Sequence, residues 1–490
     1  MNILFIAAEV SPLSKVGGLG DVAGSLTVAL TELGHDVRIV TPNYGVIDAK
    51  KYPSELKGSV KFTGGGVSFS AGVRETRLKG SVRVYLIDIP EFFQRSRVYG
   101  EPDDLERFWA FSQAALLVPE LVGWQPDVLH SHDWHSAISV SLMKAYRDKH
   151  PIWNKAGALL TIHNLQYQGH LDEKFMNSGL MDVGALGVDR LANMNIYPSM
   201  MGLGLVAADV INTVSEGYSR EILTPEFGYG MDPFLRQRQA DLFGVLNGID
   251  VREFDPSRDT NLPFKFDSDT LDARRSNKAE LQRKVGLEVR DDAPIFGAVT
   301  RLADQKGIDI LADAIPNILR TTQAQFVILG NGNPELEARL TALTNANKGR
   351  MSAIIGFDVA LGQLIYGGSD IFLMPSRFEP CGLGQMIALR YGSVPLVRQT
   401  GGLADTVQDC GHDLSVGNGF VFKNPSANEI EEAMIRAIRS YSKRQAWHKL
   451  QQRGMSQDLS WDMSAQKYVA LYKQAQGKRI SIVSITEGRA

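Results

Sequence analysis

Short apolar runs alternate with longer amphipathic stretches along most of the chain. A continuous apolar run at 3–8 is followed by a glycine-rich loop and a helical pattern that reaches about Leu33, which predicts a strand, a loop and a helix. Further strands are predicted at 37–41, 82–89, 127–135, 158–164 and 208–215. Strands that alternate with helices in this way are typical of a doubly wound parallel sheet.

A second series of the same kind begins near residue 295. It predicts strands at 295–300, 326–330, 352–357, 371–374, 394–397 and 419–422. Helical patterns lie between them, for example Ile308, Leu311, Ala312, Ile315 and Leu319, whose spacing marks one buried face. A chain of 490 residues is also longer than one core usually supports. We therefore expect an α/β protein with two tandem doubly wound, Rossmann-like domains.

The boundaries follow from changes in composition. The first domain is expected over 1–246 and the second over 247–460, with a polar surface helix at 272–287 that ends at Gly286. A helical pattern within 461–480 is expected to pack back on the first domain, and 481–490 to form a tail.

Composition excludes several function classes. The chain has 52 basic and 55 acidic side chains and a net charge of -3, so bulk charge does not favour nucleic acid or membrane surfaces. Its two cysteines, Cys381 and Cys410, fit a reducing compartment and no disulfide framework. The first residues lack the basic region of a signal peptide, and no apolar run approaches the roughly 20 residues that span a bilayer. We expect a soluble cytoplasmic protein with no nucleic-acid or membrane partner.

The segment after the predicted strand at 371–374 has the build of an anion site. A turn brings Arg377, Glu379 and Cys381 to the start of a helix, where unpaired N–H groups and the helix dipole favour negative charge. Glu379 would be repelled by an anion unless it faces sugar hydroxyls or a cationic reacting centre. The alternative is an ordinary acid in the first turn of a helix.

Arg301 and Lys306 bracket a turn after the strand at 295–300. Two cations at a helix N-terminus oppose its dipole, so helix stability does not explain them. An anionic ligand does, and together with the dipole they could hold a diphosphate leaving group without a metal. The alternative is a pair of solvated surface charges.

Polar side chains also follow two strands of the first domain. His130, His132, Asp133, His163 and Asn164 are expected to face one crevice at the carboxyl ends of the strands. The string H-S-H-D-W-H resembles a metal site, but its order differs from that of binuclear metallohydrolases. Histidines satisfied by the backbone, with Asp133 as a helix cap or a sugar contact, are the other interpretation.

The glycine loop at 15–21 matches neither the dinucleotide fingerprint nor a P-loop, and leaves a backbone cradle beside Lys15. Together these features describe a cleft that binds a nucleoside diphosphate and a polyhydroxylated group, which points to glycosyl transfer.

Eight strings occur in the order found in one known family. The chain resembles the bacterial glycogen synthases and plant starch synthases, retaining glucosyltransferases of the GT-B type in which two Rossmann-like domains face a deep cleft. The strings are K-V-G-G-L-G-D-V (15–22), H-S-H-D-W-H (130–135), T-I-H-N-L-Q-Y-Q-G (161–169), F-G-Y-G-M-D (227–232), L-N-G-I-D (246–250), R-L-A-D-Q-K-G (301–307), S-R-F-E-P-C-G-L (376–383) and T-G-G-L-A-D-T-V (400–407).

The resemblance implies a set of site residues. Glu379, His163, Lys15, Arg301 and Lys306 would be catalytic, with Arg301 and Lys306 on the departing diphosphate and Glu379 on the glucosyl group. Donor contacts would also come from Gly17, Gly18, Asp133, Asn164, Asn247, Phe357 (stacked on adenine) and the amides of Cys381, Gly382 and Leu383.

The resemblance also implies the reaction. The family transfers glucose from ADP-glucose to the non-reducing end of an α-1,4-glucan or maltooligosaccharide, with retention, and needs no metal or other cofactor. Three positions depart from its pattern, namely Gly384, Gly202 and Glu216. Three alternatives therefore stay open: a non-catalytic glucan-binding paralogue, a glycosyltransferase of the same fold with a small acceptor, and a metallohydrolase that uses the histidine cluster.

Overall fold

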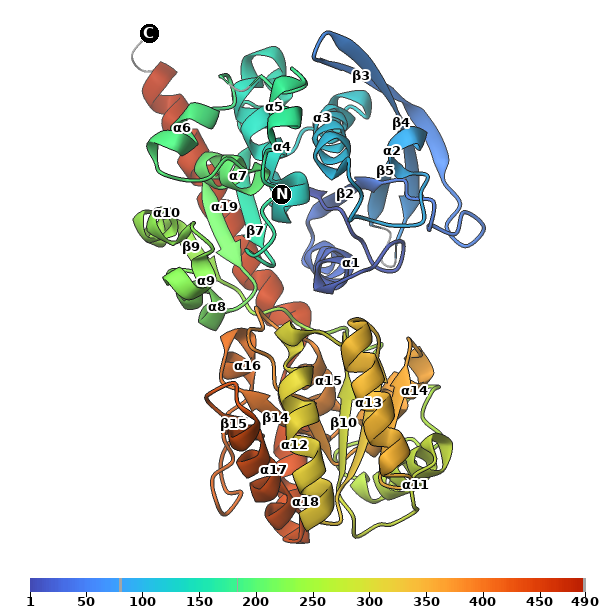
Figure 1. Cartoon of the computed structure of the whole chain (residues 1–490). Helices are drawn as coiled ribbons and strands as arrows, with labels where there is room; N and C mark the ends of the chain where they lie inside the picture. Colours follow the sequence, from blue (N-terminus) through green and yellow to red (C-terminus); the bar gives the residue numbers. More distant parts are fainter. Residues whose placement is uncertain (79–81, 183, 488–490) are drawn as a thin grey trace. The chain divides into compact units, whose positions relative to one another are not determined.

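The structure is a computed structural model that describes residues 1–78, 82–182 and 184–487. It divides into two compact units (Figure 1). Unit 1 comprises Met1–Asn247 together with the chain from Trp461 onward, and unit 2 comprises Gly248–Ser460. Unit 2 is thus inserted between the two segments that build unit 1.

Unit 1 contains a sheet that has nine strands over the described residues, in the order β3-β4-β5-β2-β1-β6-β7-β8-β9. They are β1 (Asn2–Ile6), β2 (Asp36–Pro42), β3 (Glu55–Gly64), β4 (Val67–Arg77), β5 (Arg83–Asp88), β6 (Val128–His132), β7 (Gly157–Ile162), β8 (Val210–Thr213) and β9 (Leu242–Gly244).

All pairs in this sheet are parallel except β3 with β4 and β4 with β5. The chain moves outward from β1 through β2 to β5, then returns to add β6 on the other side of β1. The topological switch point, where open α/β sheets bind their ligands, therefore lies between β1 and β6.

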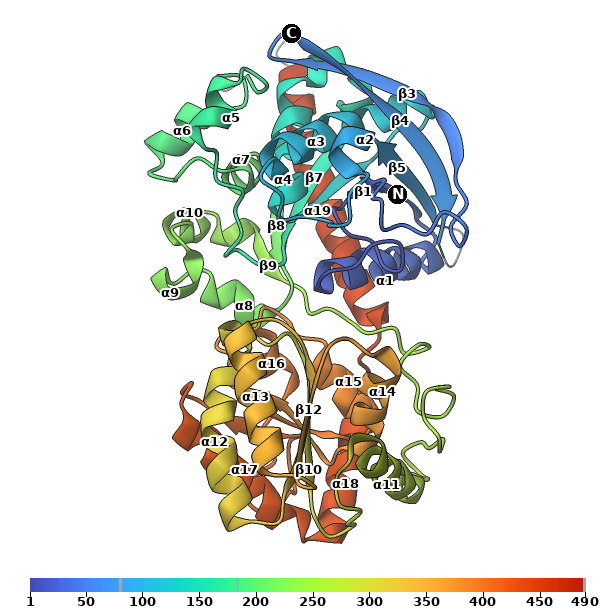
Figure 2. The same ribbon diagram turned by 45° about the vertical axis from the view of Figure 1, so that its right-hand side comes forward.

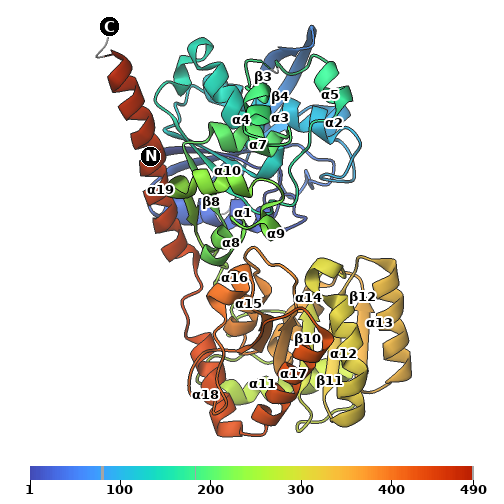
Figure 3. The ribbon, with the colours of Figure 1, turned by 60° about the vertical axis from the view of Figure 1, so that its left-hand side comes forward.

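Helices cover both faces of this sheet. The helices are α1 (Gly18–Glu32), α2 (Pro90–Phe93), α3 (Asp104–Leu121), α4 (Asp133–Ala145), α5 (Glu173–Asn177), α6 (Val188–Asn193), α7 (Met200–Ala207), α8 (Glu216–Glu221), α9 (Pro225–Gly228), α10 (Asp232–Gln237) and α19 (Trp461–Glu487). The last of them, α19, lies along the sheet (Figure 3) and buries Trp461, Tyr468 and Tyr472 in the same core as strand β1 and helix α1.

Unit 2 contains a parallel sheet that has six strands over the described residues, in the order β12-β11-β10-β13-β14-β15. They are β10 (Ile295–Val299), β11 (Gln325–Gly330), β12 (Met351–Ile355), β13 (Ile371–Met374), β14 (Val394–Arg398) and β15 (Phe420–Phe422). Counted within the unit this is the Rossmann order 3-2-1-4-5-6, so its switch point lies between β10 and β13.

Two helical layers enclose the sheet of unit 2 (Figure 2). One layer contains α12 (Ile308–Thr321), α13 (Pro334–Ala346) and α17 (Ala427–Tyr441), and the other contains α11 (Arg274–Val285), α14 (Val359–Gly368), α15 (Gly384–Arg390) and α18 (Arg444–Met455). A short helix, α16 (Gly401–Thr406), follows β14. The apolar stripe predicted at Ile308, Leu311 and Ile315 is fully buried.

Three features differ from the sequence prediction. The hairpin of β3 and β4 was not predicted, although Gly65 and Gly66, both with positive φ, form the kind of turn that joins such strands. The tail expected over 481–490 is helical as far as Glu487, and 488–490 lie outside the described residues. An existing helix adds residues without a new nucleation cost, which offsets the low propensity of this β-branched segment.

The third difference concerns α11, which ends at Gly286 as predicted but is not a simple surface helix. It buries Arg274, Asn277, Lys278 and Gln282. Over the described residues, none of the helices has both the length and the apolar character needed to cross a membrane.

Candidate functional site

In unit 2 the predicted residues gather on two turns that flank the switch point. The first turn, residues 301–307, follows β10, and the second, residues 375–383, follows β13. Parallel neighbours end at the same edge of a sheet, so these turns lie side by side. They carry the cations Arg301 and Lys306 and the carboxylate Glu379.

Lys306 and Glu379 form an ion pair across the switch point. The Lys306 Nζ lies 2.6 Å from Oε2 of Glu379, and both side chains are largely buried. The Ser376 hydroxyl donates to the same oxygen at 3.0 Å. This pairing explains how a carboxylate is held at a site otherwise suited to anions. It uses one of the three N–H donors of the ammonium group, so Lys306 retains capacity for a further acceptor.

Gly307 brings the two turns into contact. Its φ is +66°, and a Cβ there would lie 2.0 Å from the carbonyl oxygen of Pro375. Only glycine fits this position. Arg377 braces the same junction, since its guanidinium donates to both carboxylate oxygens of Asp309 at 2.6 Å and to the carbonyl of Asp304 at 2.7 Å. The sequence placed Arg377 in the anion site, but its role here is to hold the turns together.

The other predicted residues of unit 2 lie around these turns. Arg301 is exposed, and its guanidinium lies 3.4 Å from Oε1 of Gln305. Cys381 is buried, Gly382 has a φ of +72°, and Leu383 precedes the first residue of α15. Phe357 follows β12 with 87% of its side chain exposed, so its ring is open to a stacking partner.

In unit 1 the structure brings Asp133, His163 and Asn164 together beside the switch point. Oδ1 of Asp133 accepts hydrogen bonds from the backbone N–H of His163 at 2.7 Å and of Asn164 at 3.3 Å. Asp133 also has a φ of +54°, a strained conformation for a residue with a side chain. Burial raises the pKa of Asp133 to about 7, against which the two N–H donors act.

His163 contacts His132, with Nε2 of the first 3.0 Å from Nδ1 of the second. Burial lowers the pKa of His163 to about 3 and that of His132 well below its usual value. Both rings are therefore neutral near pH 7, and one donates to the other.

The remaining histidines of the cluster point elsewhere, contrary to the prediction for His130. The Thr161 hydroxyl donates to Asn212, so it accepts from Nε2 of His130 at 2.6 Å, and the Tyr472 hydroxyl then donates to Nδ1 of His130 at 3.0 Å. His135 packs against the rings of Trp134 and Phe108. Both are structural residues because they are enclosed by the core. Within the described ranges, no group of three or more His, Cys, Asp and Glu side chains is arranged to hold a metal ion.

Glu9 occupies the glycine loop, a feature that sequence reasoning missed. Oε2 of Glu9 accepts from the N–H groups of Val16 and Gly17 at 2.5 and 2.8 Å, and Oε1 accepts from the Tyr99 hydroxyl at 2.8 Å. An internal carboxylate thus takes the place of a bound anion at Gly17. An acid immediately after a buried strand and before a glycine loop was the available signal.

The two remaining predicted contacts of the loop lie nearby in sequence. Gly18 begins α1 with open space around it, and Lys15 is half exposed and lies 2.8 Å from Asp21. Asn247, the last residue before unit 2, is buried, and its Oδ1 has no hydrogen-bond partner among the described residues.

Comparisons with known proteins cover both units. Residues 2–237 match the family model described as starch synthase catalytic domain, and residues 280–453 match glycosyl transferases group 1. A glycogen synthase of Moorella thermoacetica is 42% identical over 486 residues, which is 98% of each chain. The chain belongs to the glycogen synthase and starch synthase family.

Solved structures agree with this membership. The catalytic domain of starch synthase IV from Arabidopsis thaliana, bound to ADP and acarbose, matches 97% of this chain and 99% of its own with a TM-score of 0.89 and 33% identity. A sucrose-phosphate synthase from Thermosynechococcus elongatus has a TM-score of 0.60 at 18% identity over 96% of this chain and 98% of its own, a likeness of fold alone. The two Rossmann-like units are those of the GT-B glycosyltransferase fold.

The three departures from the family pattern have local explanations. A Cβ on Gly384 would lie 3.1 Å from the Phe372 ring and 3.2 Å from the Met374 sulfur, so a larger residue requires those side chains to shift. A Cβ on Gly202 would lie 3.0 Å from the hydroxyl of Ser199, which caps α7. Glu216 lies in the first turn of α8, where the helix dipole favours an acid.

Proposed function

We propose that this glycosyltransferase moves glucose from ADP-glucose to the non-reducing end of an α-1,4-glucan or maltooligosaccharide, with retention of configuration. The observation that carries the proposal is the buried Lys306–Glu379 pair at the switch point of unit 2. Family membership supports the reaction, and the ADP and acarbose of the starch synthase IV structure support the donor and acceptor classes.

Departure of the diphosphate is assigned to Arg301 and Lys306. As the glycosidic bond of the donor breaks, negative charge develops on the leaving phosphate, and preorganised cations stabilise that charge with little reorganisation. Lys306 is preorganised because Glu379 fixes its ammonium group, and Arg301 extends from the same turn. The amides of Cys381, Gly382 and Leu383 are assigned to the donor as well.

Glu379 is assigned to the glucosyl group. With one oxygen held by Lys306 and Ser376, the carboxylate can accept sugar hydroxyls and stabilise the positive charge that develops at the reacting carbon. Phe357 is assigned to adenine, since its exposed ring offers a stacking surface.

The residues of unit 1 are assigned to the sugar and to donor orientation. Asp133 fixes the backbone at His163 and Asn164, and His163 would reach a ligand through Nδ1 because its Nε2 contacts His132. Lys15, Gly18 and Asn247 are assigned to the donor. Gly17 is assigned through close backbone approach, because its N–H already serves Glu9.

No metal is assigned to the reaction, since the two cations can balance the leaving group. We also place the protein in the cytoplasm, where a reducing environment suits its two buried free thiols, Cys381 and Cys410.

The test is glucose transfer to maltooligosaccharide from ADP-glucose and, separately, from UDP-glucose, with EDTA present and the products sized. Elongation by single glucose units from ADP-glucose is expected. Elongation from UDP-glucose alone would contradict the donor, and loss of activity in EDTA would contradict metal independence.

Two further outcomes separate the alternatives. Glucan binding without turnover would indicate a non-catalytic paralogue, and a single transfer to a small sugar would indicate a small-acceptor enzyme. Lys15→Ala is expected to remove most of the activity while the fold is retained, and full activity would contradict its assignment to the donor.

A further inference from the structure

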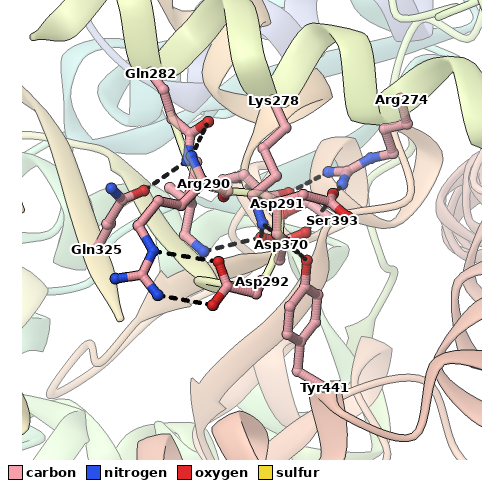
Figure 4. Close-up of polar contacts among 12 residues, drawn as sticks. Arg274, Lys278, Gln282, Arg290, Asp291, Asp292, Gln325, Asp370, Ser393 and Tyr441 are labelled. Carbon is pink, nitrogen blue, oxygen red and sulfur yellow. Dashed lines mark hydrogen bonds and ion pairs between the residues drawn. The ribbon is translucent and has the colours of Figure 1, made fainter. Parts of the chain in front are cut away.

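Helix α11 buries a stripe of polar side chains in unit 2. Arg274, Lys278 and Gln282 are spaced four residues apart and so lie on one face of the helix, and all three are buried (Figure 4). Long charged side chains are seldom buried without partners, because removing a charge from water is costly. This face therefore requires an electrostatic explanation.

One carboxylate serves both buried cations. Lys278 Nζ lies 2.8 Å from Oδ2 of Asp370, whereas the closest approach of the Arg274 guanidinium to that residue is 4.0 Å, between Nη1 and Oδ1 (Figure 4). Oδ2 of Asp370 also accepts from the N–H of Ile295 at 2.9 Å. The buried layer thus holds two positive charges and one negative charge.

Backbone carbonyls satisfy only part of Arg274. Its Nε donates to the carbonyl of Tyr391 at 2.9 Å, and its Nη2 donates to those of Tyr366 (3.1 Å) and Ser369. These carbonyls lie at the ends of α14 and α15, whose dipoles favour a cation. Burial still lowers the pKa of Arg274 to about 10, so the compensation is incomplete. Nη1 has no such carbonyl partner in the described part of the chain.

A pocket opens beside this layer, with an empty volume of about 490 Å³ that includes open solvent. Arg275 and Arg444 add two exposed cations to its lining, and His448 lies there as well. Trp447 also lines it, and the buried indole N–H of Trp447 has no hydrogen-bond partner among the described residues. The unused groups of the pocket are therefore hydrogen-bond donors.

Three carboxylates of the lining oppose these cations without balancing them. Asp370 is held by Lys278, while Asp272 and Asp291 are exposed. Asp291 also contributes its carbonyl oxygen, which accepts from Lys278, Tyr441 and Arg444 at 3.1, 3.2 and 3.1 Å. Four basic side chains thus face three acidic ones, and the deepest layer is positive.

We propose that this pocket binds a small phosphate-class anion, either inorganic phosphate or the phosphate group of a monoester. Such a group supplies acceptors to Nη1 of Arg274, to Arg275 and to Arg444, and guanidinium groups suit phosphate geometry. Asp370 immediately precedes β13, so the pocket lies at the amino ends of the strands, at the opposite edge of the sheet from Glu379. The site is distinct from the one assigned to the diphosphate.

The test is calorimetric titration of the full chain with sodium phosphate at constant ionic strength, with glycerol 2-phosphate as the monoester probe. The titration uses an Arg301→Ala, Lys306→Ala background, so that anions held by the candidate diphosphate site do not contribute. Saturable binding of one phosphate is expected in this background, and its absence would overturn the proposal. The probe that binds more tightly identifies the source, phosphate or monoester.

Variants of the exposed cations locate the bound anion. In the same background, Arg275→Ala with Arg444→Ala is expected to weaken binding by about tenfold or more, because charge-assisted hydrogen bonds contribute about 1.5–3 kcal/mol each. Lys449→Ala removes another exposed cation of α18 that does not line the pocket, and it is expected to change nothing. Equal affinity in the double variant and the control, or equal loss in both, would overturn the assignment.

Discussion

At the scale of the residue, Asp133 combines two unfavourable conditions. Its backbone is left-handed, and its carboxyl is buried so far that its pKa rises to about 7. Strain of this kind persists where the surrounding structure fixes it, and here the fixing contacts are the N–H groups of His163 and Asn164. A residue that helps to shape the candidate sugar site therefore costs the fold stability.

The raised pKa of Asp133 gives stability a definite pH dependence. Between about pH 4 and pH 7 the unfolded chain loses the Asp133 proton while the native chain keeps it, so stability falls as pH rises through this window. Asp133→Asn keeps an acceptor for His163, tolerates positive φ and removes the titration. Its stability relative to the unmodified chain is expected to grow from pH 4 to pH 7, by up to a few kcal/mol, in urea unfolding.

Asp172→Asn is the matched control for this measurement. Asp172 also accepts a backbone N–H in unit 1, from Phe175 at 2.7 Å, but it is exposed. Parallel pH profiles for the unmodified chain and Asp133→Asn would show that burial of Asp133 is not the cause.

Glu379→Gln is predicted to reduce glucose transfer by about a hundredfold or more, because a preorganised charge near the reacting centre is lost. The amide still accepts from the Ser376 hydroxyl, so the fold should be unchanged. The measurement is kcat with ADP-glucose, with thermal unfolding as the check on stability. Glu335→Gln, an exposed acid in the first turn of α13, serves as the control, and equal kcat in the two variants would remove Glu379 from the site.

At the scale of the element, the turns after β10 and β13 act as one piece. Gly307 allows their backbones to meet, and the Arg377–Asp309 pair holds them in that position. The position of Lys306 against Glu379 therefore depends on backbone contact as well as on side-chain charge.

Gly307→Ala is predicted to displace this junction. A left-handed alanine costs about 1–2 kcal/mol anywhere, and here its Cβ would also overlap the carbonyl of Pro375. The control is Gly286→Ala, which has a φ of +74° and no described heavy atom near its Cβ. Unfolding should show a larger loss for Gly307→Ala, and only this variant should lose glucose transfer. Equal effects would mean that the contact between the turns is unimportant.

The sequence predicted the elements that build both switch points but not all of their surroundings. Buried parallel strands announce themselves as apolar runs, and every strand expected on that ground is present. The β3–β4 hairpin is largely exposed and mixes polar with apolar residues, so it carried no such signal. Helix α11 gave a misleading one, because its buried face is itself polar.

The candidate site was predicted less fully than the fold. Glu379 and Lys306 were identified from their positions after strands, but their pairing depends on contact between distant turns. Glu9 bonding to the glycine loop and Tyr472 bonding to His130 are likewise tertiary contacts, which local pattern does not encode.

At the scale of the whole molecule, unit 1 is built from the two ends of the chain. Tyr468 of α19 is fully buried, and its hydroxyl accepts from Nδ2 of Asn212 at 3.1 Å. Tyr472 closes the hydrogen bonds of His130 in the same core. The C-terminal helix is thus part of the core of unit 1.

Tyr468→Ala is predicted to destabilise unit 1 by about 3–5 kcal/mol, as expected for removal of a large buried ring. Met463→Ala, on the same helix but with 61% of its side chain exposed, should have little effect. Urea unfolding followed by hydrogen exchange reports the two units separately. A loss of protection in unit 2 instead of unit 1 would contradict this account.

The placement of α19 sets an order of assembly during synthesis. Every strand of unit 2 leaves the ribosome before Trp461 does, so unit 2 can fold while unit 1 still lacks one of its helices. Until then the nascent first segment exposes the apolar surface that Tyr468 and Tyr472 later cover, which makes it a substrate for chaperones. A premature stop codon just before Trp461 would spare all of unit 2 and yet leave unit 1 unable to complete its core.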